Sequence, residues 1–123
     1  VDACDIEPVA VRAARENAAR NDVADRIRVE PGSVGPDGPF PGAYDLVLAN
    51  IIARVLVELA AGLAAATAPG GTLVLAGIIE AREPAVERAF AAEGLVLADR
   101  AQIEDWVSRV YRREPIEAAG SPG

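Results

Sequence analysis

Two side chains have the types and positions needed to bind or act on a ligand, and each follows a short apolar stretch. Asp5 ends the stretch that begins at Val1, and a helical pattern starts directly after it. Nucleotide-binding α/β domains use this order of strand, acid and helix to present a carboxylate to the hydroxyls of a ribose. Asn50 follows the stretch Ala43–Ala49, at the carboxyl edge of a predicted strand, where open α/β sheets bind ligands. Each residue also has a structural alternative, because Asp5 can cap a helix and Asn50 can form a turn.

The elements that must position these residues alternate between strand and helix patterns. Apolar residues recur at helical spacing after Pro8, whereas Ala43–Ala49 and Thr72–Ile78 are nearly continuous apolar runs, as in strands buried on both faces. Pro69-Gly70-Gly71 and Gly94 are expected to stop the second and third helices. The predicted order is strand Val1–Cys4, helix Pro8–Asn21, strand Arg26–Glu30, loop Gly32–Gly42, strand Ala43–Ala49, helix Ala53–Ala66, strand Thr72–Ile78, helix Glu80–Glu93, and an antiparallel pair at Leu95–Ala98 and Trp106–Arg112. This alternation predicts an α/β fold with a mainly parallel sheet covered by helices.

Other side chains have structural interpretations. The lone cysteine, Cys4, is predicted to be a small buried residue. Trp106 and Tyr111 either line a substrate or fill the end of the core, and the alternation of Trp106, Ser108 and Val110 favours the core. Residues 1–113 are predicted to form the folded domain, and residues 114–123 a disordered tail.

Composition restricts the classes of function. The 123 residues carry a formal net charge of −7, which argues against a nucleic-acid surface and suits a small cationic cofactor or a basic protein partner. Acidic residues flank the basic cluster Arg109, Arg112 and Arg113, so we expect a solvated charged strand edge there. The sequence has no His, which excludes histidine-based nucleophile pairs and histidine metal ligands, and we expect no metal. With no secretion signal and no apolar run that spans a bilayer, the protein is expected to be cytoplasmic and not membrane-bound.

Four segments, taken in order, resemble the class I S-adenosylmethionine-dependent methyltransferases, and most closely the family that methylates ribosomal protein L11. They are Asp5-Ile6-Glu7-Pro8 with Glu16-Asn17-Ala18 and Asn21; Asp45-Leu46-Val47-Leu48-Ala49-Asn50-Ile51; Pro69-Gly70-Gly71 through Ala76-Gly77-Ile78; and Glu104-Asp105-Trp106. The resemblance covers about Val1 to Arg113 and departs from the family pattern at Ala76, where a Ser is usual.

The resemblance implies S-adenosylmethionine as cofactor, a Rossmann-like sheet with helices on both faces, and N-methylation of lysine or N-terminal amines on ribosomal protein L11. In this interpretation Asp5 accepts hydrogen bonds from the ribose hydroxyls. Ile6 flanks the adenine ring, although a core position fits it nearly as well, and Ser33 contacts the adenine edge or is only a turn residue. Asn50 is the expected catalytic residue and also contacts the cofactor, since its oxygen can accept amine hydrogens and orient the lone pair.

The resemblance also implies that the first sheet strand and the glycine-rich cofactor loop do not stand in this sequence. In class I enzymes that strand lies centrally, so we expect its absence to leave unpaired backbone groups in the middle of the sheet. The family's N-terminal domain, which recognises the substrate protein, is also expected to be missing. The chain by itself is therefore expected to be unstable or rearranged, and inactive.

Three alternatives remain open at this point. The chain resembles methyltransferases that act on other proteins, which are close neighbours of the L11 family. A nicotinamide-dependent dehydrogenase also places an acid after its second strand. The third is a non-catalytic remnant, in which the fold persists without cofactor.

Overall fold

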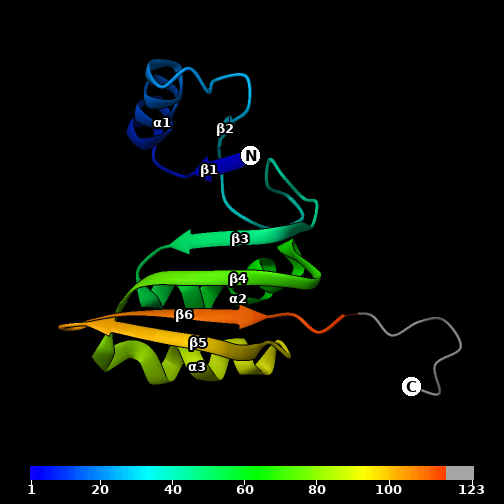
Figure 1. Cartoon of the computed structure of the whole chain (residues 1–123), viewed down its shortest axis with the longest axis vertical. Coiled ribbons are helices and arrows are strands. Elements are labelled where there is room, and N and C mark those ends of the chain that lie inside the picture. The colour runs from blue at the N-terminus through cyan, green and yellow to red at the C-terminus, as the bar shows by residue number, and fades with distance from the viewer. Residues whose placement is uncertain (116–123) are drawn as a thin grey trace, which may run out of the picture. The chain divides into compact units, whose positions relative to one another are not determined.

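The computed structural model describes residues 1–115, which form two compact units (Figure 1). The first unit is Val1–Pro41, and the second begins at Gly42. Each unit has its own sheet, with two strands in the first and four in the second. The predicted tail, 114–123, lies almost entirely outside the described residues. Within the described part of the chain, no helix is long and apolar enough to cross a membrane.

The N-terminal unit consists of β1 (Asp2–Asp5), α1 (Pro8–Arg20) and β2 (Arg28–Pro31), in good agreement with the predicted elements. The two strands are parallel, as a strand–helix–strand unit requires. Pro8 lies in the first turn of α1, where backbone N–H groups have no acceptor within the helix, so the missing N–H of proline costs nothing. Val11 and Ala18 of α1 are buried together with Val29 of β2 and form the small core of this unit.

The C-terminal unit holds the larger sheet, whose strand order is β3-β4-β6-β5. Its elements are β3 (Tyr44–Asn50), α2 (Ala53–Ala66), β4 (Thr67–Ile79), the 3-10 turn η1 (Glu80–Arg82), α3 (Glu83–Ala92), β5 (Val96–Ile103) and β6 (Trp106–Arg112). The pair β3–β4 is parallel, whereas β4–β6 and β6–β5 are antiparallel. The predicted α/β class and the terminal antiparallel pair are therefore confirmed, whereas the prediction of a mainly parallel sheet is wrong for this unit, since two of its three strand pairs are antiparallel.

The core of this unit lies between the sheet and two helices, α2 and α3, which pack against each other. Leu56 of α2 and Phe90 of α3 are fully buried, as are Leu73 and Leu75 of β4. The prediction that the strand around Ala43–Ala49 is buried on both faces is wrong, because every second residue of β3 faces away from these helices. Leu46 is 58% exposed and Leu48 is 70% exposed, whereas Ala49, which is paired with Leu75, is buried.

The Pro69-Gly70-Gly71 sequence does not stop α2, contrary to prediction. The helix ends at Ala66, and the Thr67 hydroxyl donates a hydrogen bond to the carbonyl oxygen of Leu63 (2.9 Å) as the backbone turns into β4. β4 then runs through the Pro-Gly-Gly sequence. Gly94 does end α3 with a φ of +78°, as predicted. β5 extends to Ile103, well beyond the predicted Ala98.

The predicted orientation of β6 is also wrong. Val107, Arg109 and Tyr111 face the core, so Trp106 belongs to the opposite face and is 54% exposed. Arg109 is only 4% exposed and is not part of a solvated edge. The prediction relied on apolar and polar residues alternating along the strand. Because the buried Arg109 is charged, the face that points to the core did not look apolar in the sequence.

Cys4 is exposed, contrary to prediction. Its neighbour Ala3 is paired with the buried Val29, and consecutive residues of a strand point to opposite faces. Cys4 therefore faces away from the small core. Partial desolvation raises the pKa of the Cys4 thiol, and the charge of Asp5 raises it further, so the thiol stays protonated at neutral pH.

Candidate functional site

Asp5 ends β1, where the chain turns towards α1, and it combines a structural role with an accessible carboxylate. One carboxylate oxygen, Oδ1, accepts a hydrogen bond from the backbone N–H of Glu7 (2.9 Å), which fixes the turn. The side chain is exposed, and among the described residues its other oxygen, Oδ2, has no hydrogen-bond partner. Asp5 does not cap α1, because the N-cap is Glu7 and the helix has no side-chain cap hydrogen bond, so the capping alternative is wrong and one oxygen remains available to a ligand.

Ile6 and Ser33 lie at the same edge of the N-terminal unit as Asp5. The carbonyl oxygen of Asp5 accepts a hydrogen bond from the backbone N–H of Gly32 (2.9 Å), which joins the carboxyl ends of β1 and β2. Ser33 follows Gly32 directly and is half-buried. Ile6 is 69% exposed, so its interpretation as a core residue is wrong. The edge therefore presents a free carboxylate oxygen, an exposed apolar side chain and a loop hydroxyl.

Asn50 is the last residue of β3, in the C-terminal unit, and its side chain is exposed. It is paired with Ala76 of the parallel strand β4, and the backbone N–H of Ile51 donates to the carbonyl oxygen of Ala76 (3.2 Å). Asn50 thus stands at the carboxyl edge of two parallel strands, the position that open α/β sheets use for ligands. Its carboxamide has no hydrogen-bond partner among the residues that the structure describes.

The structure thus brings together Asp5, Ile6 and Ser33 in the N-terminal unit, whereas Asn50 belongs to the C-terminal unit. In both units the candidate residues follow the carboxyl ends of parallel strands. Trp106 is too exposed for a core role, whereas Tyr111 is 2% exposed and stacks on Phe90 with ring centroids 5.6 Å apart.

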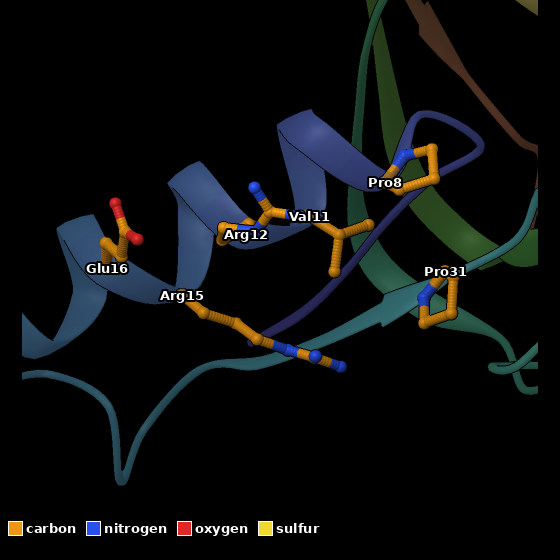
Figure 2. A pocket seen from close by; sticks show the side chains of 6 residues that line it. All are labelled: Pro8, Val11, Arg12, Arg15, Glu16 and Pro31. Carbon is orange, nitrogen blue, oxygen red and sulfur yellow. The ribbon is translucent and has the colours of Figure 1, made fainter.

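A shallow cavity of about 350 Å³ lies between α1 and β2, and none of the predicted site residues lines it (Figure 2). Its lining consists of Pro8, Val11, Arg12, Arg15, Glu16 and Pro31. The guanidinium of Arg15 donates two hydrogen bonds to the carbonyl oxygen of Val29, at 3.0 and 2.7 Å. Arg15 therefore ties α1 to β2.

Three charged side chains of the C-terminal unit form a cluster that the sequence did not indicate. Glu83, at the start of α3, accepts hydrogen bonds from Arg100 of β5 (2.7 Å) and from the buried Arg109 of β6. Arg109 also donates to the hydroxyl of Tyr111 (2.8 Å). The hydrogen bond from Arg100 is the main reason that the pKa of Glu83 lies below its usual value, and Arg109 lowers it further. Glu83 forms ion pairs with arginines of two different strands, so we assign the cluster to holding α3 on the sheet.

Comparison with known proteins decides the family. A family model described as ribosomal protein L11 methyltransferase (PrmA) matches residues 1–114. The chain belongs to this family. Proteins named ribosomal protein L11 methyltransferase from Chloroflexus aurantiacus and Pelobacter propionicus are 41% and 42% identical to it, each over 90% of this chain. The chain spans 40% and 35% of the length of these two relatives.

Solved structures agree with the membership in the L11 methyltransferase family. A ribosomal protein L11 methylase from Lactobacillus delbrueckii subsp. bulgaricus matches 93% of the chain, and the chain covers 58% of it, with a TM-score of 0.85 and 30% identity. A methyltransferase from Pyrococcus furiosus shares the fold with a TM-score of 0.76 at 17% identity, over 93% of this chain and 62% of its own. The Rossmann-like methyltransferase fold is therefore confirmed, and the dehydrogenase alternative has no support.

Proposed function

We propose that this chain supplies cofactor-binding and catalytic residues of an S-adenosylmethionine-dependent methyltransferase that methylates amino groups of ribosomal protein L11. The observation that carries the proposal is the family match through residues 1–114, which includes both candidate edges. An amide at the end of β3 and a carboxylate at the end of β1 support the proposal, because each follows the carboxyl end of a parallel strand.

The N-terminal unit has the groups that an adenosine moiety needs. The free Oδ2 of Asp5 accepts hydrogen bonds from ribose hydroxyls, and a charged acceptor strengthens such bonds. Exposed Ile6 offers apolar surface to the adenine ring, and Ser33 offers a hydroxyl to its edge. When bound, S-adenosylmethionine supplies a methyl group on a positively charged sulfur, which a neutral amine can attack.

Asn50 acts on the amine of the substrate. A lysine amine has a pKa of about 10.4 in water, so it must lose its proton before it can attack. The Asn50 side-chain oxygen accepts a hydrogen bond from an N–H of the neutral amine, which orients the nitrogen lone pair towards the methyl group. Correct orientation alone can lower the activation free energy by several kcal/mol, so an uncharged amide is sufficient for this role.

The substrate proposed is ribosomal protein L11, the protein in the names of the relatives. A basic ribosomal protein is compatible with the chain's net charge of −7, and a ribosomal substrate is consistent with a reaction in the cytoplasm. The acceptor amine is a lysine side chain or the N-terminus of the substrate.

The test is a methyl-transfer assay with the protein as the cell makes it, including any residues that flank this chain. Purified L11 and S-adenosylmethionine are incubated with the protein, and intact-mass spectrometry counts additions of one methyl group. We expect L11 to gain mass, and Asn50→Ala to slow the gain about a hundredfold, the typical cost of losing orientation. No gain in L11 together with methylation of another protein would support the alternative substrate class. Failure to bind S-adenosylhomocysteine would indicate a non-catalytic remnant.

A further inference from the structure

Gly77 of β4 lies against the side chain of Asn50. A Cβ atom at Gly77 would be 2.7 Å from Oδ1 of Asn50 and 3.3 Å from the carbonyl oxygen of Ile51. Gly77 also has a φ of +83°, in the left-handed region that favours glycine. Two independent features, the backbone angle and the close approach of Asn50, thus require glycine at this position.

The same residue forms an irregularity in the sheet. The pairing of β4 with β6 shifts register between Leu75 and Ile78, and the shift changes which residues face the core. Leu73 and Leu75 are buried before it and Ile78 after it, so the alternation is offset by one residue at Gly77. A bulge with a left-handed glycine bends its strand, and bulges often re-aim side chains next to active sites.

The bulge lies beside the end of β3, which is tied to β4 by the hydrogen bond from Ile51 to Ala76. The backbone of Gly77 therefore passes directly beside the Asn50 carboxamide. No protein hydrogen bond orients that carboxamide within the described chain, and the free space beside its oxygen at Gly77 exists because the glycine has no side chain.

We propose that Gly77 is a positioning residue for Asn50. By allowing the strand to bulge without a side chain, it leaves room for the carboxamide to lie against β4 with its oxygen at the carboxyl edge of the sheet. This inference rests on the proposed function, because the catalytic role of Asn50 belongs to it. A methyl group at position 77 would push the end of a flexible side chain aside, so catalysis should suffer more than folding does.

The experiment compares Gly77→Ala with Gly70→Ala in the complete protein. Gly70 lies in the same strand and has a similar φ of +79°, but a Cβ there would meet no atom within 4 Å. Both variants place alanine at a similar positive φ, and only Gly77→Ala brings a Cβ against Oδ1 of Asn50 and the carbonyl oxygen of Ile51. We expect Gly77→Ala to lower kcat for L11 methylation about tenfold to a hundredfold, with KM for S-adenosylmethionine nearly unchanged, because small misplacements of reacting groups have costs of this size. Gly70→Ala should keep kcat within about twofold of the unsubstituted protein.

A double-mutant cycle with Asn50→Ala distinguishes positioning from general damage. If Gly77 acts through Asn50, Gly77→Ala lowers kcat much less once Asn50 is already alanine, and its effect on Tm also becomes smaller.

If Gly77→Ala prevents folding, recovery of folded protein in the double variant supports the contact, and failure in both backgrounds overturns it. Equal kcat losses in both backgrounds, or equal losses for Gly70→Ala and Gly77→Ala, would overturn the positioning role alone. Absence of transfer by the unsubstituted protein would overturn the proposed function, and the catalytic role of Gly77 with it.

Discussion

Asp5 illustrates how one side chain can serve both the fold and a ligand. Its Oδ1 fixes the turn between β1 and α1, while Oδ2 remains accessible. A carboxylate already held by one backbone N–H has fewer rotamers to lose when a ligand binds. For the proposed ribose contact, this restraint makes Asp5 better suited than a freely rotating side chain at the same place.

The two roles can be separated by Asp5→Asn. Asparagine keeps an oxygen for the Glu7 N–H but removes the charge, so stability should change little while cofactor binding weakens. We expect the free energy of S-adenosylhomocysteine binding to become less favourable by about 1.5–3 kcal/mol, the range for hydrogen bonds to charged groups. Isothermal titration calorimetry measures this change, and Asp25→Asn, an exposed charge in the same unit, is the matched control. Equal affinities for the two variants would rule out the ribose role.

At the residue scale, strand ends were easier to predict than burial. Asp5 and Asn50 were identified because a polar residue that follows an apolar run marks the edge of a sheet. The burial of Arg109 could not be predicted, because the carboxylate that compensates it, Glu83, is far away in the sequence. The close approach of Gly77 to Asn50 was missed for the same reason, since it depends on the register between two strands.

At the scale of elements, the Glu83 cluster joins α3 to β5 and β6. The side chains of Glu83 and Arg109 are 11% and 5% exposed, so the pair is poorly screened by solvent, while Arg100 completes the cluster from the surface. Since the folded protein lowers the pKa of Glu83, ionised Glu83 stabilises the fold. This contribution to stability is fully present when the pH lies above the pKa of Glu83 in the unfolded chain, about 4.5. It is lost as the pH falls through the lower pKa of Glu83 in the folded protein.

Glu83→Gln tests this cluster. The substitution leaves Arg109 buried without a countercharge, and breaking a buried pair in this way costs about 3–5 kcal/mol of unfolding free energy at neutral pH. Urea unfolding at pH 7 and at decreasing pH below 4.5 measures it. The difference between the unsubstituted protein and the variant should shrink as the pH falls, because both then lack the carboxylate. A difference that is independent of pH would show that Glu83 acts through packing and not through its charge.

The observed boundaries of helices and strands agree with the predicted ones where a local preference of the backbone sets them. They differ where pairing between distant strands sets them. Gly94 ends α3 because the left-handed conformation is a local preference of glycine. The Pro69-Gly70-Gly71 sequence lies within β4 because pairing partners accommodate it: the N–H of Gly70 donates to the carbonyl oxygen of Arg113 (2.8 Å), and that of Arg113 donates to Gly71 (3.0 Å). Such distant partners leave no signal in a local pattern.

At the scale of the whole molecule, the two units differ in the apolar core that supports them. The C-terminal unit buries large side chains from two helices and two strands, including Leu56, Leu73 and Phe90. The N-terminal unit buries only Val11, Ala18 and Val29, and its two strands form a separate sheet. The order of strands and helices in the sequence predicted the α/β class. The division into two sheets depends on which strands pair, and the spacing of apolar residues along the sequence gives no information on strand pairing.

This imbalance predicts that the units of the chain open at different free energies. A segment of about 40 residues with a two-stranded sheet has little apolar surface to bury and is marginally stable by itself. In hydrogen exchange followed by NMR, the amides of α2, β4 and β6 should be protected up to the global unfolding free energy. The amides of α1 and β2 should exchange through smaller openings, at least tenfold faster, which corresponds to about 1.4 kcal/mol. Val29→Ala should accelerate exchange in the N-terminal unit and leave β4 unchanged, because it removes a side chain from the smaller core alone. Equal protection of α1 and β4, with both responding to Val29→Ala, would mean that the chain unfolds as one cooperative structure and that the small core is not the weaker one.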